Sequence, residues 1–73
     1  MLTEIELDGL YIFMEDLEIE VKKEFDLYHV NMIFPAVYAY MQILTSIDGY
    51  DYESCKKRLK NFCIELLSAN KGF

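Results

Sequence analysis

One histidine and two cysteines are the side chains of this protein best suited to nucleophilic catalysis or zinc binding. They are His29, Cys55 and Cys63, and the chain has no other histidine or cysteine. A nucleophile needs a base and an orienting group within hydrogen-bonding reach, and a zinc site needs ligands paired at short spacings. His29 has only Asp26 close to it in the sequence, and the two cysteines lie eight residues apart. We therefore expect no catalytic site, no metal site and no cofactor, and we predict that the protein is not an enzyme.

The two cysteines also bear on the cellular compartment. If both lie on one helix, they are separated by about 12 Å along its axis, which is further than a disulfide can span. We therefore predict two reduced thiols, as is usual for a cytoplasmic protein. The chain does not begin with a basic stretch followed by an apolar run, so we expect no signal peptide.

Acidic side chains are the stronger candidates for a binding function. The formal net charge is −6, and residues 1–28 contain nine acids and two lysines. A surface of this sign repels nucleic-acid phosphates and anionic membranes, so we expect no direct nucleic-acid binding. If residues 4–26 are helical, five acids fall in one narrow sector about 33 Å long, which Tyr11 and Lys22 interrupt. These five are Glu4, Asp8, Glu15, Glu18 and Asp26.

Such a row can be interpreted in two ways. Charges on successive turns of a helix lie about 5 to 6 Å apart, which is comparable to the spacing of phosphates along a DNA strand. The row would then fit a protein groove built for DNA. The alternative interpretation is an ordinary solvated helix face, because acidic helix faces are common.

The element that must position this row is an uncharged stretch of eighteen residues, 30–47. It predicts a central helix that is covered on nearly all sides. Proline is disfavoured inside a helix, so we expect this helix to begin between Asn31 and Pro35 and to end at Asp48 and Gly49. The stretch is barely long enough to cross a bilayer and lacks a basic flank, so we expect no membrane span.

The segment before it, residues 3–24, fits two structures. A helical interpretation has a capping box at Thr3 and Glu6 and an apolar stripe at helical spacing. The alternative is a hairpin or meander with a turn at Asp8 and Gly9, which would explain isoleucines that the helix leaves on its polar side. Glutamates and lysines in residues 18–24 favour the helix, which we predict. The stripe comprises Leu7, Leu10, Met14, Leu17, Val21, Phe25 and Tyr28, and the unexplained isoleucines are Ile5, Ile12 and Ile19.

A third helix is predicted after Gly49. Asp51 or Ser54 can cap its start, and an apolar face then recurs at helical spacing. This face comprises Tyr52, Cys55, Leu59, Phe62, Cys63 and Leu66. We therefore predict an all-α fold, in which residues 1–73 form one three-helix bundle around the central apolar helix. The alternative is an α+β fold, with an N-terminal hairpin or meander followed by two helices.

Self-association is also expected. A chain of this length buries only about 60% of its unfolded surface, and aromatic side chains are common anchors of interfaces. Tyrosines stand on opposite sides of the central helix. We predict a homodimer with Tyr38, Tyr40 and Met41 at its interface.

The length, the charge and the row from Glu4 to Asp26 together resemble a class of proteins. Short, strongly acidic, single-domain chains without catalytic residues are similar to the inhibitors that phages and other mobile elements make against host machines. That class includes DNA mimics that block restriction, CRISPR or replication proteins. No sequence motif carries the resemblance.

The resemblance implies a cytoplasmic inhibitor that occupies the basic DNA-binding surface of a host replication or defence protein. The alternative is a structural or regulatory helical dimerisation module, which would bind its partner through apolar surface.

Overall fold

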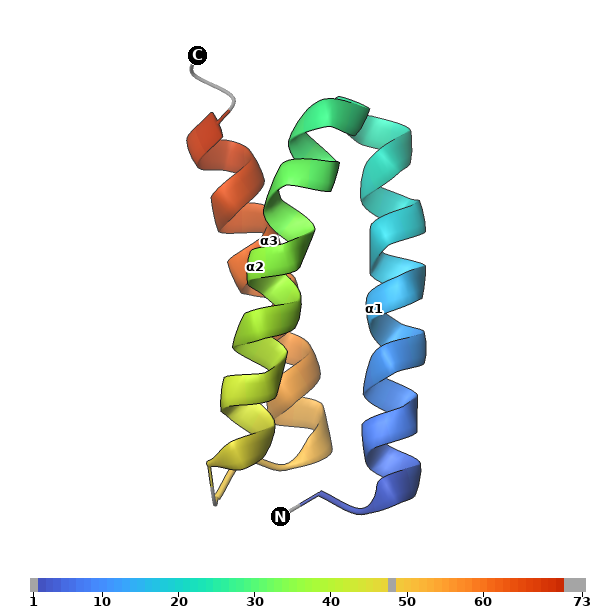
Figure 1. Cartoon of the computed structure of the whole chain (residues 1–73), viewed down its shortest axis with the longest axis vertical. Helices are drawn as coiled ribbons and strands as arrows, with labels where there is room; N and C mark the ends of the chain where they lie inside the picture. Colours follow the sequence, from blue (N-terminus) through green and yellow to red (C-terminus); the bar gives the residue numbers. More distant parts are fainter. Residues whose placement is uncertain (1, 48, 71–73) are drawn as a thin grey trace.

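Three helices make up the bundle. The computed structural model describes residues 2–47 and 49–70, and these contain no strand. The helices are α1 (Glu4–Glu24), α2 (Leu27–Ser46) and α3 (Tyr52–Asn70). They run alternately up and down, and α2 packs against both of the others (Figure 1). This confirms the predicted all-α bundle with a central helix and excludes the N-terminal hairpin or meander.

Helix α1 starts with the predicted capping box. The Thr3 hydroxyl accepts a hydrogen bond from the Glu6 amide at 3.1 Å, and the Glu6 carboxylate accepts one from the Thr3 amide at 3.0 Å. These two bonds satisfy backbone donors that the first turn of a helix leaves free. The helix ends at Glu24, where Phe25 adopts an extended conformation. Placing Tyr28 in the α1 stripe was wrong, because this residue lies in α2 and is exposed.

Gly9 lies inside α1 and forms no turn. A Cβ atom at this position would stand 2.6 Å from the hydroxyl oxygen of Tyr52 in α3. That distance is too short for a real contact, so the absence of a side chain at Gly9 leaves room for the Tyr52 ring against α1. The glycine that suggested a hairpin turn therefore serves helix packing.

Helix α2 begins earlier than the sequence predicted. Its first residue is Leu27, and Pro35 lies within it. A proline leaves the carbonyl four residues before it, that of Asn31, without an amide partner. Both Asn31 and Pro35 are exposed, so this carbonyl lies on a side of the helix that water can reach. The predicted start between Asn31 and Pro35 was wrong for this reason.

Helix α2 ends at Ser46, with Ile47 extended as its C-cap, so it stops before the expected end at Asp48 and Gly49. The start of α3 agrees with the expected capping residues. Gly49 has a φ of +103°, which glycine adopts far more readily than other residues, while Asp48 lies outside the described residues. The Asp51 carboxylate accepts a hydrogen bond from the Ser54 amide at 2.7 Å. This bond holds the pKa of Asp51 below its usual value. Asp51 is therefore the residue that caps the start of α3.

The core contains fourteen buried apolar side chains, and α2 supplies more of them than either neighbour does. No charged or polar residue is buried among the described residues. None of the described helices meets the length and hydropathy needed to cross a membrane. The core residues are Leu10, Met14, Leu17 and Val21 from α1, Val30, Ile33, Phe34, Val37, Met41 and Leu44 from α2, and Cys55, Leu59, Cys63 and Leu67 from α3.

Candidate binding surface on the first helix

The charge of the protein is concentrated on α1. This helix carries eight carboxylates and two lysines, a net charge of −6, whereas α2 has no Asp, Glu, Lys or Arg. Helix α3 carries two carboxylates and four basic side chains, a net charge of +2. Every ion pair found in the described part of the chain joins residues three or four positions apart. The bases of α3 therefore form no direct ion pair that would neutralise α1.

Four of the five acids predicted to bind a partner share one side of α1. Glu4, Asp8 and Glu15 are exposed, and Glu18 is half-buried, with its carboxylate 3.0 Å from the Lys22 amine. From Glu4 to Glu18 this acidic row extends about 21 Å along the helix.

Asp26 does not continue the row. The chain leaves the helix at Phe25, and Asp26 occupies the N-cap position of α2, with its carboxylate 3.5 Å from Nδ1 of His29. The expectation of a helical row about 33 Å long that ends at Asp26 is therefore corrected. The row ends at Glu18.

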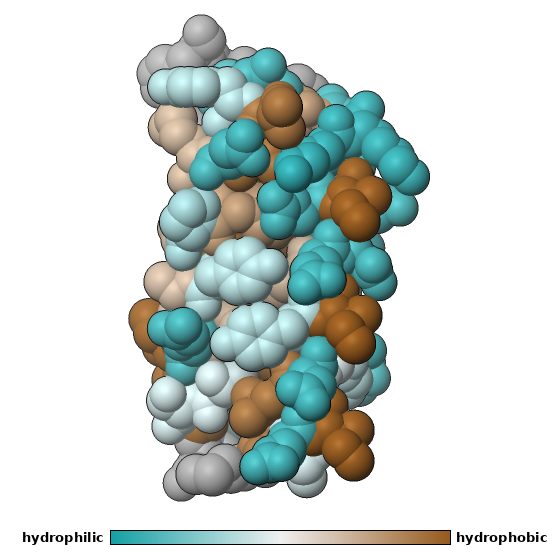
Figure 2. Space-filling view, turned by 45° about the vertical axis from the view of Figure 1, so that its right-hand side comes forward, coloured by the Kyte–Doolittle hydropathy of each residue, from teal (hydrophilic) through white to brown (hydrophobic). Residues whose placement is uncertain are grey.

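Beside the acidic row lies a row of exposed isoleucines. Ile5, Ile12 and Ile19 are 83%, 60% and 56% exposed, respectively. Seven residues make nearly two helical turns, so the three side chains project from one side of α1. Figure 2 shows hydrophobic side chains recurring along this helix with hydrophilic ones next to them. We call these three residues the isoleucine row; the sequence marked them as unexplained and did not place them in the site.

A second set of carboxylates lies on the other side of the isoleucine row. Asp16, Glu20 and Glu24 are exposed and follow one another at intervals of four residues. By helical geometry, residues four apart lie close together on one face. The isoleucine row is thus flanked by carboxylates on both sides.

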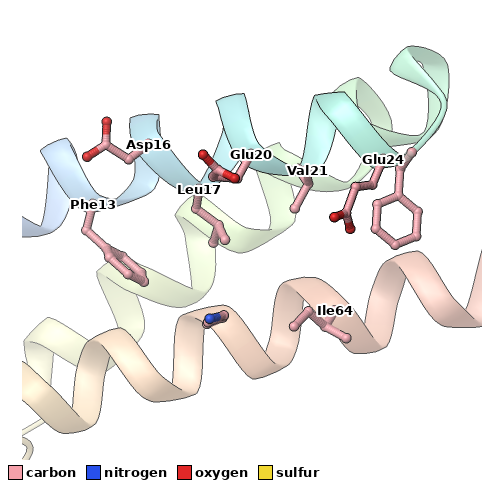
Figure 3. A pocket seen from close by; sticks show the side chains of 9 residues that line it. Phe13, Asp16, Leu17, Glu20, Val21, Glu24 and Ile64 are labelled. Atoms are coloured by element: carbon pink, nitrogen blue, oxygen red, sulfur yellow. The ribbon is translucent and has the colours of Figure 1, made fainter.

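This second set borders a groove between α1 and α3 with a volume of about 380 Å³. Figure 3 shows Leu17 and Val21 pointing from α1 toward α3, and Ile64 lying opposite on α3. Phe13 and Phe25 also line the groove, as does Lys60, the only basic residue there among residues 2–47 and 49–70. An apolar floor beneath carboxylates suits the long aliphatic stem and charged head of an arginine or lysine side chain.

The three residues predicted for a dimer interface have different surroundings. Met41 is 2% exposed and belongs to the core. Tyr38 is partly buried, and its ring stacks on that of Tyr11 with 6.4 Å between centroids. Tyr40 is partly buried, and its ring lies against that of Phe62 with 4.6 Å between centroids. The side chain of Met41 is therefore used inside the subunit, whereas the two tyrosines border the outer surface of α2.

The two cysteines first considered for catalysis lie apart from these surfaces. Cys55 and Cys63 are free and fully buried, and burial raises the pKa of the Cys63 thiol to about 11. A thiol needs a lowered pKa and access to solvent to act as a nucleophile, so neither cysteine is suited to that role. Within residues 2–47 and 49–70, no three His, Cys, Asp or Glu side chains are grouped so that they could hold a metal ion.

Comparison with protein-family models, with curated protein sequences and with solved structures finds no significant match to this chain.

Proposed function

We propose that this protein is a non-enzymatic inhibitor that binds a basic surface of another protein through the outer side of α1. The observation that carries the proposal is the isoleucine row with carboxylates on both sides. An exposed apolar row that lies outside the core of its own chain is typical of a surface that a partner covers. The carboxylates require that this partner be basic.

The acidic row gives the proposal its specific form. A DNA-binding protein presents lysines and arginines that follow the phosphate backbone. Glu4, Asp8, Glu15 and Glu18 offer negative charges along about 21 Å of a rigid helix. We therefore propose that the partner is a host replication or defence protein and that bound α1 excludes DNA from it. A cytoplasmic, phage-borne or mobile-element origin is part of the same proposal.

The isoleucine row adds what charge alone does not supply. Exposed ion pairs contribute little affinity each and are screened by salt, whereas apolar contacts are not. Burial of three isoleucines in the partner's surface would stabilise the complex by several kcal/mol, at about 2 kcal/mol for each side chain. The carboxylates then direct the encounter and select the partner, while the isoleucines slow dissociation.

A capture experiment with matched charge changes tests the proposal. The wild-type chain, the double variant E15K/E18K and the control E53K/E65K are immobilised and exposed to host cell extract at low salt. The last two have the same net charge, but the control changes α3 instead of α1. We expect the wild type and the control to retain one basic protein that duplex DNA then displaces, and E15K/E18K to retain none of it.

Two results would contradict the proposal. Equal capture by all three chains would show that the acidic side of α1 is not the binding surface. A captured protein that DNA does not displace would refute DNA mimicry and leave only binding to a basic surface.

A further inference from the structure

The outward-facing side of α2 carries exposed apolar residues from Tyr28 to Ile43. Tyr28, Met32 and Ile43 are 69%, 55% and 57% exposed, and Pro35, Ala36 and Ala39 between them are exposed as well. Each of these six residues has another of the six three or four positions away, so together they lie on one side of the helix. The buried side chains of α2 occupy the opposite side. We call these six residues the outer face of α2.

We infer that the outer face of α2 binds the same face of a second copy of this chain. This inference does not depend on what α1 binds. Its first support is charge: α2 contains no Asp, Glu, Lys or Arg, and its exposed polar residues Asn31, Gln42 and Ser46 are neutral. Two copies can therefore meet through α2 without placing like charges together. Two α1 helices, each with a net charge of −6, would repel each other.

The second support is the placement of small residues. Ala36 and Ala39 lie at the middle of α2, whereas the larger Tyr28, Met32 and Ile43 lie toward its two ends. Small side chains at a crossing point let two helices approach to about 8 Å between axes. In a two-fold dimer, residues near the axis meet their own copies. The axis would therefore pass close to Ala36 and Ala39.

The third support is the area required. A stable interface buries about 800 Å² of each partner. The chain exposes 5082 Å² in all, so this is roughly one sixth of its surface. The exposed side chains from Tyr28 to Ile43, with Tyr38 and Tyr40 at their borders, are the surface of α2 that would supply this area. The two tyrosines predicted at the interface would then lie at its rim, and Met41 would lie beneath it.

A charge placed near the axis tests the inference. Ala39 is exposed in the single chain, so A39E and A39K should fold, which circular dichroism checks. The control S68E adds the same charge on the exposed side of α3. The mass of each chain is measured across concentrations by light scattering and sedimentation. We expect the wild type and S68E to be dimers, and A39E to dimerise about 100-fold more weakly because two like charges would meet.

A mixture of the two variants provides the positive test. Equal amounts of A39E and A39K should form a mixed dimer, because opposite charges then meet at the axis. A wild-type chain that stays monomeric at millimolar concentration would overturn the inference. So would an A39E dimer as tight as that of S68E, or a wild-type dimer that high salt dissociates, since the latter would indicate pairing of α1 with α3.

Discussion

Helices α1 and α2 both expose large apolar side chains. On α1 these side chains are surrounded by carboxylates, whereas α2 contains no Asp, Glu, Lys or Arg. On α1, Ile5, Ile12 and Ile19 stand between carboxylates on a helix of net charge −6. On α2, the outer face from Tyr28 to Ile43 lies on a helix without Asp, Glu, Lys or Arg. A similar apolar exposure is therefore combined with two different charge patterns in one small bundle.

The difference indicates how one chain can keep two contacts apart. Apolar surface is attractive but does not by itself choose a partner, so selectivity has to come from what surrounds it. Carboxylates around the isoleucine row make a second copy an unfavourable partner there and a basic protein a favourable one. Their absence on α2 leaves self-association without a penalty. The charges of α1 would thus act as much by repulsion as by attraction.

The largest expected effect separates the isoleucine row from the core. Leu10 is fully buried, whereas Ile12, two residues further along the same helix, is 60% exposed. Leu10→Ala should lower the free energy of unfolding by about 3 kcal/mol, because it leaves a cavity. Ile12→Ala should change it by less than about 0.5 kcal/mol. Urea unfolding followed by circular dichroism measures both values, and a similar loss in the two variants would show that the isoleucine row is structural.

A smaller effect is expected at the start of α1. Thr3→Ala removes the side-chain acceptor for the Glu6 amide and should destabilise the protein by about 1 kcal/mol. Ser68→Ala, on the exposed side of α3, is a matched control that should change stability by less than about 0.5 kcal/mol. Because the cap holds the first turn, which carries Glu4 and Ile5, Thr3→Ala should also weaken binding of the α1 partner slightly. Weaker binding at the same stability as the wild type would place Thr3 itself in the contact.

How far the sequence predicts this molecule differs between its parts. The helical stripe, the capping box at Thr3 and the cap at Asp51 are set by neighbours a few residues away, so local patterns were enough to predict them. Whether a helix can contain Pro35, and whether Gly9 is needed next to Tyr52, depends on which side of each helix faces water or another helix. That information is tertiary, and the rules for proline and glycine taken alone led to a late start for α2 and to a possible hairpin.

The candidate surface was predicted in part for the same reason. Helical periodicity correctly placed Glu4, Asp8, Glu15 and Glu18 on one side of α1, but it could not show that the helix ends before Asp26. The isoleucine row was visible in the sequence as a seven-residue repeat on the polar side. From the sequence alone, this repeat favoured the strand interpretation. Only the fold shows that these side chains remain exposed on a helix.

The smallest expected effect concerns Tyr38, which lies between the acidic row of α1 and the outer face of α2. Burial, and then the carboxylates of Glu18 and Glu15, raise the pKa of its phenol above the usual 10.0. The folded protein therefore holds this proton more tightly than the unfolded chain does. The corresponding stability is fully present below about pH 10 and is lost as the pH rises through the raised pKa.

Neutralising Glu15 and Glu18 should lower the pKa of Tyr38 but should not return it to the usual value. In E15Q/E18Q the two charges are gone and burial remains, so the pKa of Tyr38 should fall but stay above 10.0. Spectrophotometric titration of the tyrosines measures the shift, with Tyr38→Phe as the control that assigns it. A pKa that does not change in E15Q/E18Q would show that the acidic row does not act on Tyr38. The electrostatic effect of the α1 carboxylates would then be confined to α1. The stacked rings of Tyr11 and Tyr38 would mark the boundary with the uncharged outer face of α2.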